Sequence, residues 1–211
     1  MVVSVPVHLV SHPLAQDALA SLRDVDTPPG RFRRLAERLS LFLAAEALKD
    51  LPVEAGTVET PLGPADAQRV TGDVVVVPVL RAGLGMLDAV LRLIPWARVG
   101  HIGLRRDETT AVASRYYSRL PPGMESSYVL MVDPMLATGG SAVDAIHVLR
   151  EAGARDIRIL CIVAAPEGIA TVEAAFPDVR IYTPVVDKGL NERKFIVPGL
   201  GDFGDRLYGT E

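Results

Sequence analysis

The chain has 211 residues, of which 49% are hydrophobic and 23% are charged, and its formal net charge is −4. This composition suits a folded globule and excludes a largely disordered chain. The acidic balance argues against a general binder of nucleic acids or membrane surfaces, although it permits a local site for one anionic small molecule. A chain of this length buries about 70% of its unfolded surface, so it needs no disulfide or structural metal to fold.

The N-terminal part predicts two helices and an arm. A short helix is expected over residues 11–24, and a long amphipathic helix over 28–51, where Phe32 and Leu39 belong to a helical apolar repeat. The turn-rich residues 53–70 predict a hairpin or arm. The apolar start lacks a basic segment, and no apolar run approaches the ~20 residues that cross a bilayer. We therefore expect a cytoplasmic protein without membrane contacts.

From residue 73 onward, apolar runs alternate with helical patterns. Strands are expected at residues 73–80, 97–104, 126–133, 157–165 and 179–186, and helices at 83–95, 139–153 and 166–176. This alternation indicates an α/β fold with a mostly parallel sheet flanked by helices. We expect a single domain over 1–211, with the core at about 70–186, the N-terminal helices and arm at 1–69, and a C-terminal loop at 187–211.

Three features fall outside the alternation. The polar residues 105–126 predict a long structureless connection, of the kind that often serves as a lid. The glycine-rich tail, 187–211, carries aliphatic and aromatic anchors, which favour an ordered wrapping loop. Cys161 lies in an apolar run without an activating neighbour, so we expect a buried structural thiol.

The stretch "VLMVDPMLATGGS" carries the clearest chemistry. Asp133 ends an apolar strand, where ligands of open parallel sheets bind. Gly139 and Gly140 let a backbone approach an anion, Thr138 and Ser141 add hydroxyl donors, and the helix start adds N–H groups, so a phosphate fits over residues 137–141. An ionised carboxylate only accepts hydrogen bonds, which suits sugar hydroxyls and suggests a ribose phosphate. The alternative is a simple helix cap.

This stretch resembles the phosphoribosyl-diphosphate-binding signature of type I phosphoribosyltransferases, in the version found in uracil phosphoribosyltransferases. Pro134 stands where most relatives carry a second acid, so Asp133 would hold the ribose hydroxyls largely alone. The resemblance implies the type I phosphoribosyltransferase fold, with a small hood or arm from the terminal segments. The residues it assigns to phosphoribosyl diphosphate are Arg81, Ala82, Gly83, Arg106, Asp133, Pro134, Met135, Leu136, Ala137, Thr138, Gly139, Gly140, Ser141 and Asp202.

Two further segments resemble the family's diphosphate site. "PVLRAG" is similar to its diphosphate loop, in which Arg81 would grip the leaving group beside the N–H groups of Ala82 and Gly83, with a non-proline cis peptide next to Arg81. A dinucleotide-binding loop is the weaker alternative, because Asp88 stands where a third glycine belongs. "GLRRDETT" is similar to the start of the family's lid and aligns Arg106 with an arginine that reaches the diphosphate. The alternative for this segment is a solvated charged loop.

The segment "FIVPGLGDFGD" closely resembles the family's uracil-recognition loop. The resemblance implies that main-chain groups of Ile196, Gly201 and Phe203 pair with uracil, and that Asp202 faces the base, the ribosyl diphosphate and its metal. The alternative is a glycine-rich tail turn. The implied cofactor is Mg²⁺, held mainly by substrate oxygens and water, with Asp202 as a candidate partner of that water shell.

The resemblance thus implies an enzyme that joins uracil to 5-phosphoribosyl diphosphate and yields UMP and diphosphate, a salvage reaction. Arg81, Arg106, Asp133 and Asp202 would be its catalytic residues. Two alternatives stay open: an RNA-binding regulator of pyrimidine genes with the same fold, and a phosphoribosyltransferase for another base. The family also implies a homodimer or higher homo-oligomer, for which the helix at 31–50 could supply an interface, and leaves a GTP effector open.

Overall fold

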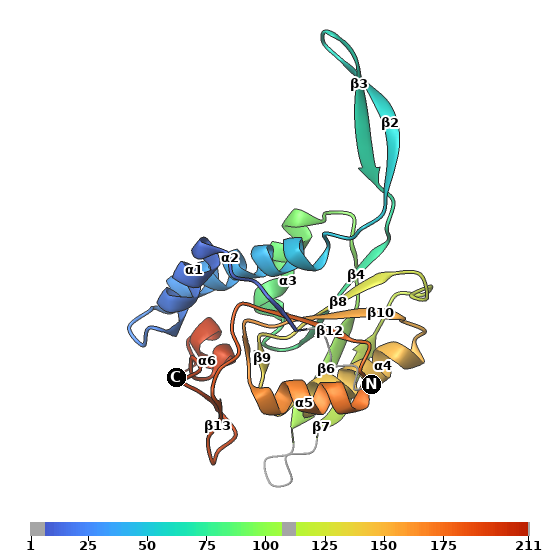
Figure 1. The fold of residues 1–211 in the computed structure, drawn as a ribbon. Helices are drawn as coiled ribbons and strands as arrows, with labels where there is room; N and C mark the ends of the chain where they lie inside the picture. Colours follow the sequence, from blue (N-terminus) through green and yellow to red (C-terminus); the bar gives the residue numbers. More distant parts are fainter. Residues whose placement is uncertain (1–6, 107–112, 211) are drawn as a thin grey trace.

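The core of the molecule is a mostly parallel β-sheet (Figure 1). The computed structural model describes residues 7–106 and 113–210, and gives the backbone alone for residues 105, 106 and 113–115. Within this part, the strand order is β1-β12-β10-β8-β4-β6-β7, β5 also pairs with β4, and β7 alone runs antiparallel to its neighbour. The strands are β1 (Val7–Leu9), β4 (Val74–Leu80), β5 (Arg98–Val99), β6 (His101–Arg106), β7 (Ala113–Arg119), β8 (Tyr128–Val132), β10 (Asp156–Leu160) and β12 (Arg180–Thr183).

Helices cover both faces of this sheet, which confirms the predicted α/β architecture. One face carries α1 (Pro13–Arg23), α2 (Pro29–Ala47) and α3 (Leu84–Leu93), and the other carries α4 (Gly140–Glu151) and α5 (Pro166–Ala175) (Figure 1). Proline occupies the first turn of α1, α2 and α5, where its missing N–H removes no helical hydrogen bond.

The sheet separates two apolar cores because successive strand residues point to opposite faces. In β4, Val74 and Val76 pack into the core beneath α1, α2 and α3, whereas Val75 and Val77 pack into the core beneath α4 and α5. All four valines are fully buried, which explains why the strand reads as a continuous apolar run. Cys161 is also fully buried, and burial raises the pKa of its thiol to about 12. The prediction of a structural thiol is confirmed.

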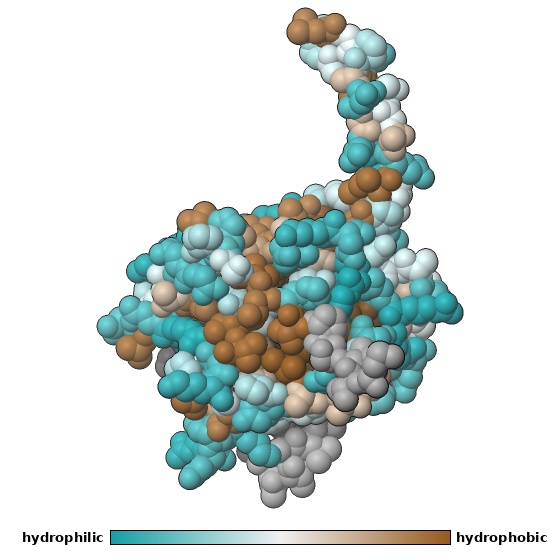
Figure 2. All heavy atoms as spheres, viewed as in Figure 1, coloured by the Kyte–Doolittle hydropathy of each residue, from teal (hydrophilic) through white to brown (hydrophobic). Residues whose placement is uncertain are grey.

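The predicted arm is a two-stranded hairpin that projects far from the body (Figure 1). Its strands, β2 (Val53–Thr60) and β3 (Gly63–Val70), pair with each other in antiparallel register. Almost all of its side chains are exposed, and Leu62 at the tip is 99% exposed. The space-filling view shows the apolar tip beyond a largely polar stalk (Figure 2). An isolated hairpin is marginally stable in water, so this one favours a partner surface.

Three predictions of secondary structure were wrong or incomplete. The edge strand β1 was not predicted, because so short a strand carries no readable alternation. The strand expected at 97–104 is broken at Gly100, whose N–H donates to the carbonyl of Val76 at 3.0 Å. The stretch 105–126 was expected to be structureless but contains β7, and its residues 107–112 lie outside the described part.

The C-terminal segment is ordered, as predicted. It forms the short hairpin of β13 (Gly189–Leu190) and β14 (Ile196–Val197) and ends in α6 (Phe203–Tyr208). In Figure 1 it wraps from the end of β12 to the side of α1 and α2. Within the described residues, no helix combines the length and apolar character that a membrane crossing requires.

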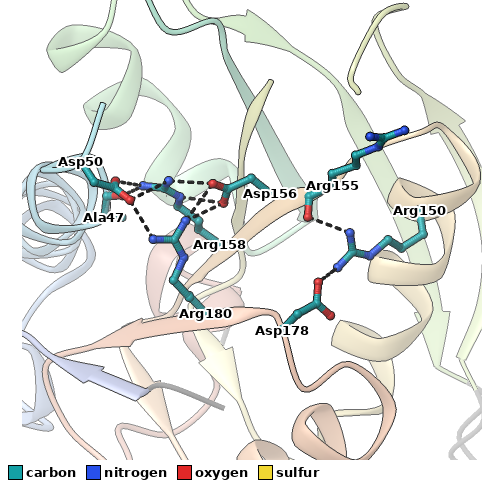
Figure 3. A network of polar contacts seen from close by, with 8 residues as sticks. All are labelled: Ala47, Asp50, Arg150, Arg155, Asp156, Arg158, Asp178 and Arg180. Atoms are coloured by element: carbon teal, nitrogen blue, oxygen red, sulfur yellow. Dashed lines mark hydrogen bonds and ion pairs between the residues drawn. The ribbon is translucent and has the colours of Figure 1, made fainter. Parts of the chain in front are cut away.

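A charged network fastens α2 to the amino ends of the strands (Figure 3). The fully buried guanidinium of Arg158, on β10, donates to the carbonyl of Ala47 and to the carboxylates of Asp50 and Asp156. Arg180, on β12, bridges the same two carboxylates at 2.8–2.9 Å. Burial raises the pKa of Asp50, but bonds from both arginines outweigh it and lower that pKa to about 2. Every charge in the network has an opposite partner, which is the condition for burying it without a large penalty.

Candidate active site

The loop predicted to bind a phosphate, residues 137–141, follows the carboxyl end of β8, and we call it the cradle. The strand ends at Val132, Asp133 follows, and the short strand β9 (Met135–Leu136) pairs with β11 (Val163–Ala164) before the chain enters α4. The first turn of α4 has no side-chain cap and no acidic residue. Its N–H groups and partial positive charge are therefore directed at whatever occupies the loop, as the sequence predicted.

Backbone contacts between glycines fix this cradle in place. Gly139 has a φ of 82°, which strains any other residue, and a Cβ there would meet the carbonyl oxygen of Gly168 at 2.7 Å. In return, a Cβ on Gly168 would meet the carbonyl oxygen of Ala137 at 2.6 Å. The first turn of α5 thus packs directly against the cradle, and neither glycine tolerates a side chain.

A cavity of about 300 Å³ joins the cradle to the C-terminal segment. Of the predicted site residues, those that line it are Asp133, Met135, Leu136, Ala137, Thr138, Gly139, Ser141, Ile196, Gly201, Asp202 and Phe203. Pro134 and Gly140 do not line it; Pro134 is buried behind the loop, and its carbonyl accepts from the N–H groups of Ile162 and Val163. The fold therefore brings two segments that are distant in sequence to one cavity.

Asp133 lines this cavity and has a raised pKa. The residue is partly exposed to the cavity, and partial desolvation of its carboxyl raises its pKa to about 6, although a long bond of 3.4 Å from the N–H of Met135 acts in the opposite direction. No described cation pairs with it. The carboxylate is therefore held in an environment that disfavours its charge until a hydrogen-bond donor arrives.

A second, larger cavity of about 850 Å³ adjoins the first, and Asp202 lines both. Arg81 and Ala82 line it too, and the non-proline cis peptide occurs at Leu80–Arg81, where the sequence predicted it. Arg81 is exposed and makes no ion pair with a described residue. Two carboxylates, of Asp202 and Asp205, line this cavity.

Gly83 and Arg106 differ from the other residues predicted for the diphosphate site. Gly83 lines neither cavity, and its N–H donates to the carbonyl of Val79 at 2.9 Å, so it is not available to a ligand. A Cβ on Gly83 would meet the carbonyl oxygen of Val132 at 2.4 Å, so this glycine serves the contact between β4 and β8. Arg106 ends β6 near this cavity, where Leu104 lines it, but its side chain lies outside the described part.

The C-terminal segment lines the first cavity through Ile196, Gly201, Asp202 and Phe203. The N–H of Lys188 donates to the carbonyl of Val197, and that of Asn191 donates to the carbonyl of Phe195. Ile196 lies between these two acceptors and is 5% exposed, and its carbonyl oxygen packs against Gly199, where a Cβ would meet it at 2.2 Å. Asp202 caps α6, where one carboxylate oxygen accepts from the N–H of Asp205 at 3.0 Å.

Sequence reasoning missed the residues that hold this segment. The carboxylate of Asp187 accepts the N–H of Gly199 at 2.8 Å and pairs with the guanidinium of Arg23, on α1, at 2.6 Å. Asp187 is only 8% exposed, so the pair is largely screened from water. Glu167, in the first turn of α5, accepts the N–H of Leu190 at 3.0 Å. A lone acid after the strand run "YTPVV" was the available signal for Asp187, whereas Arg23 gave none.

Comparison with known proteins identifies the relatives of this chain. The model of the uracil phosphoribosyltransferase family matches residues 9–210. Uracil phosphoribosyltransferases of Shouchella clausii and Halalkalibacterium halodurans are 50% and 49% identical to it over 206 residues, which is 97% of this chain and 99% of each relative. A solved protein from Aquifex aeolicus, 37% identical, superposes with a TM-score of 0.91 over 97% of this chain and 99% of its own. Adenine phosphoribosyltransferase of Leishmania donovani, 13% identical over 89% of this chain and 86% of its own, shares the fold with a TM-score of 0.57.

Replacing Asp133 by Asn should stabilise the protein at neutral pH. The carboxyl has a pKa of about 6 in the folded protein against 3.8 as its ordinary value, so ionisation costs the folded state stability as pH rises. We expect the variant to exceed the wild type by about 1–3 kcal/mol in free energy of unfolding above pH 6, with the difference disappearing as pH falls to about 4. Urea unfolding at several pH values measures this, and a difference that does not depend on pH would contradict it.

Replacing Asp187 by Ala should destabilise the protein by loosening the C-terminal segment. The variant leaves the guanidinium of Arg23 and the N–H of Gly199 without their partner, which costs about 2–4 kcal/mol of stability. Asp187→Asn keeps an acceptor for Gly199 and should lose less. Denaturant unfolding of both variants, with Asp178→Ala as an exposed ion-pair control, tests this ranking. Equal losses for all three would contradict it.

Proposed function

The chain belongs to the uracil phosphoribosyltransferase family, and from this we propose that it transfers a 5-phosphoribosyl group from its diphosphate to uracil. The products are UMP and diphosphate, and the role is salvage of the free base. The proposal treats residues 1–211 as one domain, in which the N-terminal helices, the core and the C-terminal base-recognition segment serve the same reaction.

One observation carries this proposal: a single cavity is lined by the cradle and by residues of the C-terminal segment. Asp133 lies at the cradle, where it would accept hydrogen bonds from the ribose hydroxyls. Asp202 lies between this cavity and the one that contains Arg81. This arrangement suits a ribose whose 5′-phosphate lies at the cradle, whose base lies at the C-terminal segment and whose diphosphate lies near Arg81.

In the reaction, the bond between the anomeric carbon and the diphosphate oxygen breaks, and a bond from uracil N1 to that carbon forms as N1 loses its proton. Negative charge develops on the leaving oxygen while the sugar becomes positively charged. Arg81 would stabilise the leaving group, and Arg106 would join it by its position in the family motif. The cradle and Asp133 would hold the sugar in line between base and leaving group. The described chemistry needs no protein nucleophile.

The oxygens of Asp202 and Asp205 suit Mg²⁺, which prefers oxygen ligands and keeps several waters. We infer that the substrate diphosphate supplies further ligands, since the described residues contain no group of three side chains placed to hold a metal. When bound, the ion would neutralise charge on the leaving diphosphate. Asp202 would orient the ion's water shell, since one of its oxygens is already used as the cap of α6.

Uracil selectivity follows from recognition by a rigid main chain. Main-chain groups of Ile196 and of the loop through Gly201 and Phe203, which line the cavity, would complement the acceptor–donor–acceptor edge of uracil. Cytosine would place its amine where uracil has an acceptor, and a site built from hydrogen bonds rejects such a mismatch strongly. The RNA-binding alternative is disfavoured by the net charge of −4 and by a C-terminal segment organised around a small cavity.

A base panel tests this function. Protein, Mg²⁺ and phosphoribosyl diphosphate should yield UMP with uracil, whereas cytosine, hypoxanthine, adenine and orotate should react at least about a hundredfold more slowly. Chromatography of the nucleotides measures the products. No UMP from the wild type would overturn the proposal, and faster turnover of another base would transfer it to a sister enzyme. A gel shift with RNA at two salt concentrations checks the regulator alternative.

We also propose that the protein is a homo-oligomer in which the hairpin arm contacts a second copy. The arm is too exposed to be stable by its own packing, and its tip residue, Leu62, is 99% exposed. A hydrophobic patch lies on the body over β1 and the segment after β12 (Figure 2), where Leu9 and Val186 are exposed. GTP activation and a cytoplasmic location stay predictions; UMP formation with and without GTP would test the first.

Replacing Leu62 by Asp should therefore weaken self-association. Sedimentation equilibrium should show a dimer or larger species for the wild type, and the variant should dissociate at a concentration at least about tenfold higher. Val25→Asp is the matched control, since Val25 is an 88% exposed apolar residue in the loop between α1 and α2. A monomeric wild type, or equal behaviour of the two variants, would contradict the proposal.

A further inference from the structure

Lys194 has an unusual backbone conformation beside the cavity of the cradle. It lies in the loop between β13 and β14, and among the described residues it is the only non-glycine with a positive φ, 63°. This left-handed conformation is strained for a residue that carries a side chain, and glycine would avoid the strain. A strained residue of this kind is a reason to look for a function of its side chain.

The loop itself is held by Asn191 and by main-chain bonds. The side-chain oxygen of Asn191 accepts the N–H groups of Arg193 and Phe195, each at 3.0 Å, and its carbonyl accepts the N–H of Lys194 at 2.8 Å. The side chains of Arg193 and Lys194 take no part in these bonds. They are exposed, and neither forms an ion pair with a described residue.

Both cationic residues line the 300 Å³ cavity together with the cradle. The other charged residues of that cavity are Asp133 and Asp202. The cradle supplies neutral donors, namely N–H groups and the hydroxyls of Thr138 and Ser141. A phosphate monoester, largely dianionic at pH 7.5, would therefore enter a cavity that already contains two carboxylates. Arg193 and Lys194 are the described cations that can offset this repulsion.

We propose that Lys194, assisted by Arg193, binds the 5′-phosphate of the substrate and of UMP from the side opposite the cradle. This inference rests on the proposed function and adds a phosphate-binding residue to it. Lys194 is exposed and lines the same cavity as the first turn of α4, so its ammonium would pair with a phosphate seated on that turn. The free energy of that contact offsets the backbone strain at Lys194 in the complex, although not in the empty protein.

Lys194→Met removes the positive charge of this side chain and so tests its contribution to phosphate binding. We expect its KM for phosphoribosyl diphosphate and its dissociation constant for UMP to rise by roughly fivefold to tenfold, and more at low salt, because an exposed charge pair is screened by ions. The KM for uracil and the affinity for uridine, which lacks the phosphate, should stay within about twofold. Lys188→Met is the matched control, since Lys188 is exposed in the same segment but lines no described cavity.

Lys194→Gly separates the phosphate contact from backbone strain. It should melt at a higher temperature than the wild type, because glycine tolerates the left-handed conformation, yet bind UMP as weakly as Lys194→Met. The inference is overturned if either variant binds UMP like the wild type, or if UMP and uridine weaken equally. Failure of the wild type to form or bind UMP would instead overturn the proposed function.

Discussion

The parallel pairing of β8 between β4 and β10 is the constraint on which the site depends. Its register aligns Val76 with Leu130 and Leu130 with Arg158, so the three strands end at one edge. The loop with Arg81 and the loop with Asp133 leave neighbouring strands at that edge, which places the proposed diphosphate and ribose sites side by side. The pairing holds because both faces of the strands are apolar and covered, so a slip by one residue would exchange the two cores.

Charged side chains are paired differently at the amino ends of the strands and at the carboxyl ends, where the site lies. At the amino ends, Arg158 is buried among Asp50, Asp156 and the end of α2, with every charge satisfied within the protein. At the carboxyl ends, Asp133 forms no ion pair with a described residue, and desolvation raises its pKa to about 6. Structural charges are thus neutralised by the chain, whereas the charge in the cavity is left for a ligand to satisfy. Such an arrangement exchanges folding stability for binding.

Local patterns in the sequence predicted the fold and the loop after β8, whereas the family resemblance pointed to the other residues that line the cavity. Asp133 ends a continuous apolar run and Gly139 precedes a helix, so strand, turn and helix could be read from neighbouring residues. Asp187 and Arg23 could not be read in this way, because their pairing joins segments that only the tertiary fold brings together. The role expected for the N–H of Gly83 was wrong for a similar reason, since its bond to Val79 depends on how the turn folds back. The role of Arg106 stays a prediction, since its side chain lies outside the described residues.

The first turn of α5 links two parts of the site through adjacent residues. Gly168 touches the cradle loop through its backbone, and Glu167 accepts the N–H of Leu190 at the base of the C-terminal hairpin. The sites proposed for the nucleobase and for the phosphate therefore both contact the first turn of α5, although different stretches of chain build them. Any tilt of α5 would change the distance between these two proposed sites, so under the proposed function the helix would help to set the length of nucleotide that fits.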